Sequence, residues 1–174
     1  MLSGINLGPN LGNSMWHSGT LAAAKQAALL GVQGIALSTP TAGGEPDFAR
    51  LEPWVGEVLE RVLGDRDLPL VNVNLPPDPR GLCWARQSVR HYDGAVVPAA
   101  DPVGREHFWF VVRAIEEIEE GTDRWAMQQG LVSHPAAPGL DRPRAPGRRG
   151  APPPGHGGCV GLVYTHGISQ GGSP

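Results

Sequence analysis

Short apolar runs recur along the first half of the chain, and each is bounded by glycine or proline. Residues 1–6, 32–38 and 68–75 form three such runs. Runs of this length without polar alternation are typical of strands buried in a parallel sheet. We therefore predict three strands. The first is so short that its sheet partners are expected to come from elsewhere.

A helix is predicted between the first two runs. The segment is rich in alanine, Ser18 or Thr20 can serve as its N-cap, and the helix is expected to run through Leu30. Gly31 then supplies the left-handed residue that commonly ends a helix. The residues before it, 7–18, are rich in glycine and asparagine and are expected to form a loop.

A second helix is predicted between the next two runs. Residues 51–63 place apolar side chains at intervals of three and four, the spacing of an amphipathic helix. Pro53 is expected in its first turn, where a missing N–H group removes no hydrogen bond. Strands that alternate with helices in this way predict an α/β fold, a parallel sheet with crossover helices.

The pattern changes after Pro79. Residues 82–90, 95–98 and 107–112 are typical of extended segments, with turn signals at Asp93-Gly94 and Pro102-Val103-Gly104. We therefore predict a β-rich arm added to the sheet. A short helix that ends at Gly130 follows, and Asp123 is expected to be its N-cap.

Composition divides the chain into two parts. Residues 1–133 have the usage of a folded α/β domain, whereas 18 of the 41 residues in 134–174 are glycine or proline. Such a composition cannot bury enough apolar surface to fold, so residues 134–174 are predicted to be a disordered tail.

Charge and hydropathy exclude two classes of partner. The net charge is −3 and the isoelectric point is near 6.0, which gives no basic surface for a nucleic-acid polymer. No apolar stretch reaches the roughly 18 residues of a membrane span, and no basic and apolar leader follows Met1. A soluble, cytoplasmic protein is expected.

The candidate chemistry lies in the first loop and the helix start that follows it. Asn6 and Asn10 offer amide groups, Ser18 and Thr20 offer hydroxyls, and the glycines between them allow a ligand to approach the backbone. Free N–H groups at a helix start favour an anion, so the pattern predicts a phosphate site. Loop and capping roles for the same residues are the structural alternative.

Two other kinds of site are not supported. His17 is next to Ser18 in sequence, which does not place its imidazole on the hydroxyl, so we reject a catalytic triad. The glycines recur at Gly4, Gly8 and Gly12 without the GxGxxG or Walker A spacing, which argues against a dinucleotide-binding unit.

Several motifs together resemble the SurE family, the stationary-phase survival proteins that act as 5′/3′-nucleotidases. The likeness runs from Met1 to about Ser133 in the order that the family shows. The matching segments are Ser-Gly-Ile-Asn at 3–6, Gly-Pro-Asn-Leu-Gly at 8–12, Ser-Gly-Thr at 18–20, Val-Asn-Val-Asn-Leu-Pro at 71–76, Arg-Gln-Ser at 86–88, Asp-Pro-Val-Gly-Arg at 101–105 and Gly-Thr-Asp-Arg-Trp-Ala at 121–126.

The resemblance implies a Rossmann-like SurE fold with an oligomerisation arm. It implies that Asn6 binds a divalent metal, Mg2+ or Mn2+, and that Asn10, Ser18, Gly19 and Thr20 surround the substrate phosphate. The implied reaction is metal-assisted hydrolysis of nucleoside 5′- and 3′-monophosphates. The implied partners are the nucleotide substrate and further copies of the chain, in a dimer or tetramer.

The sequence departs from the family in one respect that concerns catalysis. The family's N-terminal Asn-Asp-Asp-Gly motif, whose two aspartates bind the metal, is not present in these 174 residues. We therefore expect a C-terminal part of the family fold, without catalytic carboxylates and inactive alone. The alternative function is a non-catalytic fragment or an oligomerisation module.

Overall fold

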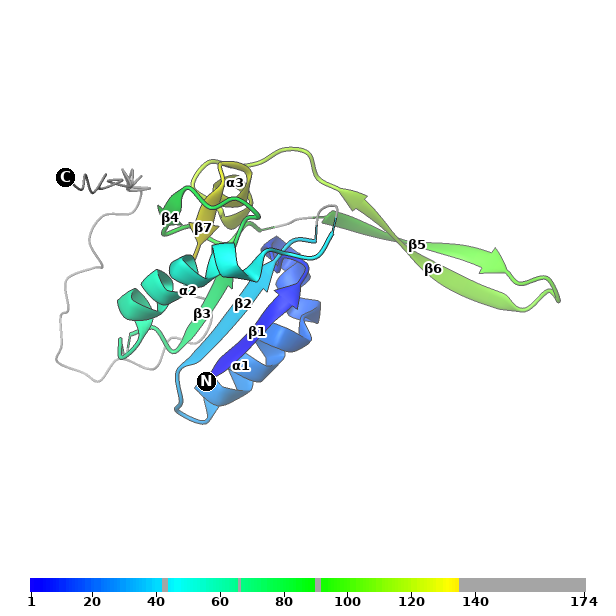
Figure 1. Ribbon diagram of the computed structural model, residues 1–174. Helices are drawn as coiled ribbons and strands as arrows, with labels where there is room; N and C mark the ends of the chain where they lie inside the picture. The colour runs from blue at the N-terminus through cyan, green and yellow to red at the C-terminus, as the bar shows by residue number, and fades with distance from the viewer. Residues whose placement is uncertain (42–43, 66, 90–91, 135–174) are drawn as a thin grey trace, which may run out of the picture.

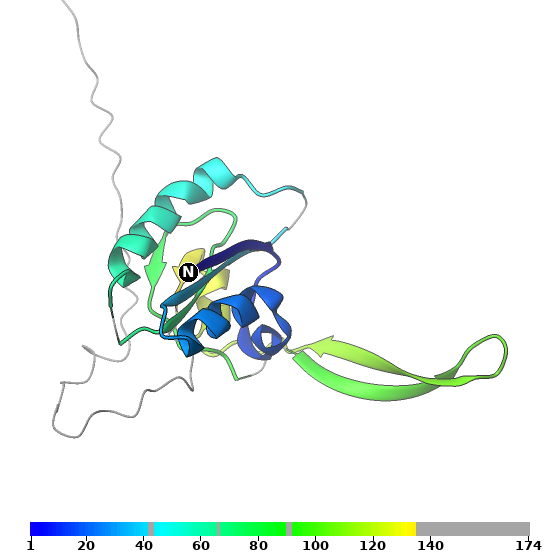
Figure 2. The same ribbon diagram turned by 90° about the horizontal axis from the view of Figure 1, so that it is seen from below.

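Five strands form one sheet, covered by a helix on each face (Figures 1 and 2). The computed structural model describes residues 1–41, 44–65, 67–89 and 92–134. The strand order across the sheet is β1 (Leu2–Leu7), β2 (Gly34–Thr39), β3 (Leu70–Asn74), β7 (Leu131–Ser133) and β4 (Gly81–Cys83). Strands β1, β2 and β3 run parallel, as predicted. The expectation that the sheet partners of the first strand come from elsewhere is wrong, because β1 has six residues and pairs with β2 of the same chain.

Strand β7 was not expected from the sequence. It has three residues, pairs antiparallel with β3 through Asn74 and Ser133, and runs parallel to β4. A strand of this length carries too little periodicity to be recognised. The extended segment predicted over residues 82–90 is likewise shorter, because regular pairing in β4 ends at Cys83.

Helix α1 (Gly19–Leu29) covers one face of the sheet. The Ser18 hydroxyl accepts a hydrogen bond from the Leu21 N–H at 3.2 Å, and Gly31 has φ +82°. Beyond it, the Val32 N–H donates to the Ala27 carbonyl, which completes a Schellman end. The predicted cap and stop are therefore both confirmed.

Helix α2 (Phe48–Val62) covers the other face. Its buried side chains Leu51, Val58 and Val62 pack in one cluster with Ile35, Leu37, Val71 and Val73 of the sheet. The helix starts earlier than predicted, because the Asp47 carboxylate caps it by accepting the Arg50 N–H at 3.2 Å. Pro53 therefore lies inside the helix rather than in its first turn.

The segment between β1 and α1, predicted as a loop, contains the 3-10 helix η1 (Gly12–His17). Met15 of η1 is buried and packs with Leu21 and Ala24 of α1 and with Ala36 of β2. This contact holds η1 against the α1 side of the sheet.

Strands β5 (Tyr92–Ala100) and β6 (Glu106–Ala114) form a long antiparallel hairpin that projects away from the sheet (Figure 2). This confirms the β-rich arm, but the hairpin is a sheet of its own and is not added to the five-stranded sheet as predicted. The turn predicted at Asp93-Gly94 is wrong, because both residues lie within β5. An added Cβ on Gly94 would lie 2.2 Å from a ring carbon of Phe110, so this glycine makes room for an aromatic ring.

The tip of the hairpin is the predicted turn around residues 102–104. The Asp101 carboxylate accepts the N–H groups of Arg105 and Val103 at 2.9 Å, and the Arg105 guanidinium at 2.7 Å. Hydrogen bonds from Arg105, first from its backbone, hold the pKa of Asp101 below its usual value. Gly104 has φ +83° and closes the turn.

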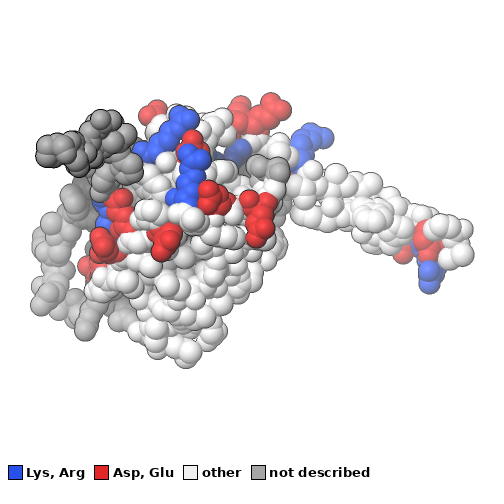
Figure 3. All heavy atoms as spheres, in the orientation of Figure 1, with Lys and Arg blue, Asp and Glu red and all other residues white. Residues whose placement is uncertain are grey.

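Charged side chains are unevenly distributed over the body. Figure 3 shows them gathered around α2 and the upper part of the molecule, while the surface over β1 and α1 carries almost none. None of the helices among the described residues is both long and apolar enough to cross a membrane. The predicted tail lies outside the described residues, apart from His134, which is buried.

Candidate phosphate-binding site

A bulge in β1 aims Asn6 at the α1 face of the sheet. Ser3 pairs with Ala36 and Asn6 pairs with Ser38, so β1 advances by one residue more than β2 over the same distance. An added Cβ on Gly4, which has φ +125°, would lie 2.2 Å from the Leu37 carbonyl oxygen. Only glycine fits this close approach, and the bulge depends on it.

Asn6 is the outermost member of a polar row across four strands. It pairs with Ser38 of β2, Ser38 with Asn74 of β3, and Asn74 with Ser133 of β7. Ser38, Asn74 and Ser133 are completely buried, whereas Asn6 is partly exposed. A ligand from solvent can therefore reach this row only at Asn6.

Asn10 is anchored to the row rather than directed toward solvent. Its N–H donates to Asn74 Oδ1 at 2.7 Å, and its amide nitrogen donates to Ser38 Oγ at 2.6 Å. Its carbonyl accepts the amide groups of Asn72 at 2.8 Å and Asn74 at 3.2 Å. Only 6% of Asn10 is exposed, so these contacts fix the loop that follows β1.

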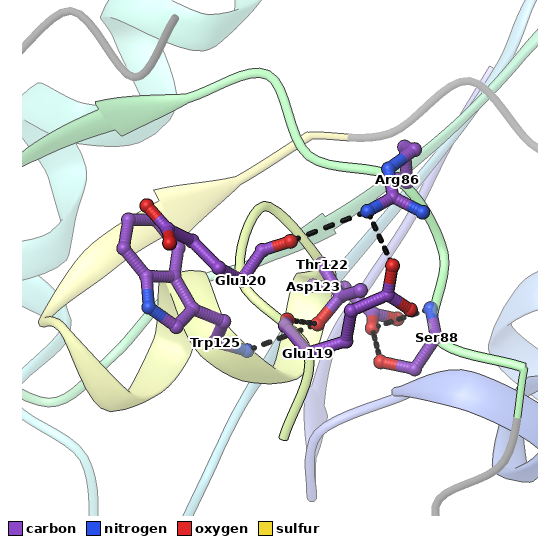
Figure 4. Close-up of polar contacts among 7 residues, drawn as sticks. All are labelled: Arg86, Ser88, Glu119, Glu120, Thr122, Asp123 and Trp125. Atoms are coloured by element: carbon purple, nitrogen blue, oxygen red, sulfur yellow. Dashed lines mark hydrogen bonds and ion pairs between the residues drawn. The ribbon is translucent and has the colours of Figure 1, made fainter. Parts of the chain in front are cut away.

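Gly12 is held by a second set of contacts, from residues far along the chain. Its N–H donates to Asp123 Oδ2 at 2.9 Å, and its carbonyl accepts the Gln87 amide at 2.8 Å. The sequence predicts Asp123 as the N-cap of α3 (Asp123–Gln128), and this prediction is wrong. Thr122 is the cap, because its hydroxyl accepts the Trp125 N–H (Figure 4).

Ser18, Gly19 and Thr20 form the start of α1, where the first N–H groups have no acceptor within the helix. Gly19 is exposed, and an added Cβ there would meet no atom within 4 Å. The turn therefore combines donors with open space, which is the arrangement that an anion needs. Asn6 lies in β1, before the loop that Asn10 and Gly12 anchor, and this turn lies after that loop. Figure 1 shows the loop joining β1 to α1.

His17 and Trp16 lie beside the turn and are exposed. The Lys25 ammonium lies 5.6 Å from the centre of the Trp16 ring, within the range of a cation–π contact. This lysine is the only charged residue of α1 and places a positive charge near the turn.

The described residues do not fit a divalent cation by themselves. The Asn6 amide nitrogen donates to the Gly8 carbonyl at 2.7 Å, which leaves one amide oxygen as a ligand. Within the part of the chain that the structure describes, no group of three His, Cys, Asp or Glu side chains gathers to hold a metal ion. A hard divalent cation needs several oxygen ligands, usually with carboxylates among them.

Sequence reasoning missed the side chains that anchor the loop. They are Ser38, Asn72, Asn74, Gln87, Ser88 and Asp123. One signal was available for two of them. In the strand sequence Val71-Asn72-Val73-Asn74 the asparagines alternate with valines, which places both amides on one face of a strand otherwise buried in the core.

Comparison with known proteins shows the family of the chain. The family model of Survival protein SurE matches residues 1–94. The chain belongs to the SurE family. It is 43% identical over 137 residues to 5′-nucleotidase SurE 1 of Thermus thermophilus, a match that covers 76% of this chain and 54% of that protein.

Other SurE proteins give the same result. The chain is 35% identical over 141 residues to 5′-nucleotidase SurE of Geobacter metallireducens, covering 76% of this chain and 56% of that protein. The crystal structure of the SurE protein from Aquifex aeolicus superposes with a TM-score of 0.64 at 34% identity, covering 77% of this chain and 56% of that chain. The chain thus spans about half the length of the SurE relatives it matches, and the expected SurE fold is confirmed.

Proposed function

We propose that the chain provides the phosphate-binding part of a SurE-type nucleotidase, which hydrolyses nucleoside 5′- and 3′-monophosphates. The observation that carries the proposal is the open turn at Gly19, at the start of α1, joined by an anchored loop to the exposed end of the polar row at Asn6. Relatives of this chain are named 5′-nucleotidases, which supports a nucleotide as the phosphate carrier.

The chemistry of the turn suits a phosphate monoester. The N–H groups of Gly19 and Thr20 are donors at the positive end of the α1 dipole. Ser18 accepts the Leu21 N–H through its oxygen, so its own hydrogen remains available to a phosphate oxygen. The hydroxyl of Thr20 adds a further donor. These groups would bind the oxygens of the phosphate and stabilise the charge that develops on them during transfer.

Asn10 has a different place in the proposal. Three of its polar groups are engaged by Ser38, Asn72 and Asn74, so we assign it mainly to holding the loop beside the phosphate. Of Asn10, only the amide oxygen would touch the substrate directly.

We confine the metal proposal to Asn6. Its free amide oxygen would contribute one ligand to Mg2+ or Mn2+, and carboxylate ligands would have to come from outside the described residues. Since the described residues lack such a set, we expect this chain alone to release little or no phosphate from nucleotides. Manganese-dependent turnover that Asn6→Ala abolishes would overturn that expectation.

The hairpin supports the proposed association of SurE chains with one another. Large apolar side chains remain exposed along it, including Phe108 at 69%, Phe110 at 61% and Trp109 at 60%. Exposed apolar surface of this kind marks a protein interface. A dimer or tetramer joined through the β5–β6 arm is therefore part of the proposed function, whereas a purely non-catalytic module is the less favoured alternative.

Binding to the turn can be tested without turnover. The 15N-labelled chain is titrated with adenosine 5′-monophosphate and, as a matched ligand without phosphate, with adenosine. We expect the amide signals of Gly19 and Thr20 to shift with the nucleotide and not with the nucleoside. Equal shifts with both ligands, or nucleotide shifts confined to residues remote from this turn, would contradict the proposal.

A further inference from the structure

Asp123 is a completely buried carboxylate outside the phosphate turn. Its Oδ1 accepts the N–H groups of Ser88 and Arg124, each at 2.8 Å, and the Ser88 hydroxyl. Its Oδ2 accepts the Gly12 N–H at 2.9 Å. Figure 4 shows Asp123 between Ser88 and the residues that begin α3. Because every one of these contacts needs an acceptor, the site requires a group with acceptors on both atoms.

These contacts join three distant parts of the chain. Gly12 lies 111 residues before Asp123, and Ser88 lies 35 residues before it. On the opposite side of Gly12, the Gln87 amide holds the carbonyl at 2.8 Å. Gly12 has φ +50° and is the first residue of η1, so its position sets where η1 begins.

The path from Gly12 to the phosphate turn is short and held by backbone hydrogen bonds. Helix η1 ends at His17, the Ser18 N–H donates to the Met15 carbonyl, and α1 starts at Gly19. A displacement of Gly12 therefore moves η1, and with it the N–H groups at the start of α1. Asp123 itself touches none of these groups and can act only through Gly12.

We propose that Asp123 is a positioning residue of the phosphate site, which fixes Gly12 and η1 so that the N–H groups of Gly19 and Thr20 converge on one phosphate. The inference rests on the proposed function. Asp123→Asn is the sharpest variant, because asparagine keeps the shape of the side chain. It retains one acceptor oxygen for Ser88 and Arg124 but turns an NH2 group toward the Gly12 N–H.

The matched control is Thr122→Val. Thr122 caps the same helix, accepting the Trp125 N–H and donating to the Glu119 carbonyl at 2.6 Å, and it makes no contact with Gly12. This variant should destabilise α3 as Asp123→Asn does while leaving Gly12 in place. A merely structural role of Asp123 would make the two variants alike in ligand binding.

The probe is inorganic phosphate, followed through the amide signals of Gly19 and Thr20 in the full 15N-labelled chain. Hydrogen exchange of the Gly12 amide is measured alongside. We expect Asp123→Asn to speed exchange at Gly12 and to weaken phosphate binding about tenfold, because the N–H groups of Gly19 and Thr20 then no longer meet one phosphate together. Thr122→Val should change phosphate affinity by less than about twofold.

If Asp123→Asn does not fold, Gln87→Ala provides the second test, since it releases the other side of the Gly12 peptide and leaves Asp123 in place. It should weaken phosphate binding in the same direction. The inference is overturned if Asp123→Asn or Gln87→Ala frees the Gly12 amide yet binds phosphate like the unmodified chain, or if Thr122→Val weakens binding equally. Failure of the unmodified chain to bind phosphate at Gly19 and Thr20 would instead refute the proposed function, and this inference with it.

Discussion

At the scale of single residues, the substitution Gly19→Ala tests phosphate binding separately from stability. An added Cβ there meets no protein atom within 4 Å, so Gly19→Ala should leave the free energy of unfolding unchanged or raise it by up to about 1 kcal/mol. The new methyl group would occupy the space in which phosphate approaches the backbone. We therefore expect weaker phosphate binding without loss of stability, measured by calorimetric titration and urea unfolding.

Gly56→Ala is the matched control for this variant. Gly56 lies exposed on α2, and an added Cβ there also meets nothing within 4 Å. The gain in helix propensity should be similar and phosphate binding should be unaffected. If Gly19→Ala binds phosphate as well as Gly56→Ala does, phosphate does not approach this turn.

His134 makes the stability of the body depend on pH. Burial, followed by the positive charge of Arg61, lowers the pKa of His134 from 6.5 to about 4. Between pH 6.5 and pH 4, His134 therefore binds a proton in the unfolded chain but not in the folded chain. The free energy of unfolding should fall as the pH drops from 6.5 to 4, by on the order of 3 kcal/mol in total.

This expectation is tested by urea unfolding at pH 7 and pH 4.5, in the unmodified chain and in His134→Leu. The leucine places an apolar side chain beside Trp84. Carboxylates titrate in both proteins, so the difference between them reports the imidazole. The variant should lose less stability on acidification than the unmodified chain. Identical losses would show that His134 is accessible to protons in the folded state.

At the scale of the element, the bulge in β1 depends on Gly4. A Cβ there would lie 2.2 Å from the Leu37 carbonyl oxygen, at a φ that side chains rarely adopt. Gly4→Ala should therefore lower the free energy of unfolding by about 2 kcal/mol or more. Gly44→Ala, where an added Cβ has open space, should have little effect. Equal urea midpoints for the two variants would contradict this account of the bulge.

The boundaries of an element can be predicted from the sequence when the residues that set them are close together in the chain. The cap at Ser18 and the stop at Gly31 are set by neighbours in the chain, so the boundaries of α1 follow from the sequence almost to the residue. The predicted start of α2 is late, because the prediction begins the helix at Leu51 and leaves out the cap at Asp47. Gly94 is predicted as a turn residue. A glycine is needed there because of the ring of Phe110 on the other strand, and this contact cannot be inferred until the hairpin is paired.

The candidate site shows the same limit. Asn6 and Ser18 can be predicted as candidates because they lie in one compact motif. The anchors of that motif cannot, because the contacts of Asn10 with Asn74 and of Gly12 with Asp123 span 64 and 111 residues. A pattern of local spacing carries no information about such contacts, which exist only once the sheet brings the segments together.

At the scale of the whole molecule, the hairpin is apolar on both of its faces. In the paired register Val96 lies opposite Phe110 on one face, and Val97 lies opposite Trp109 on the other. All four side chains are at least 44% exposed. A partner that covered one face would leave the other in water, so we expect further copies of the chain to enclose the hairpin from both sides.

Charge substitutions on the two faces test this arrangement. Phe110→Lys and Trp109→Lys should each reduce the assembled mass measured by light scattering, and the double variant should be monomeric at concentrations where the unmodified chain is not. Val103→Lys, at the turn and already 76% exposed, is the control that should leave assembly unchanged. Assembly that persists in the double variant would place the interface elsewhere on the molecule.

The length of the hairpin means that a neighbouring copy bound to it would be mechanically coupled to the sheet from a distance. Strands of nine residues extend about 30 Å at about 3.3 Å per residue, so a neighbour gripping the far end is held well away from the sheet. At its near end, the Tyr92 carbonyl accepts the amide of Asn13, which belongs to η1. A force applied to the hairpin by a neighbouring copy would thus reach η1, which leads into the proposed phosphate turn.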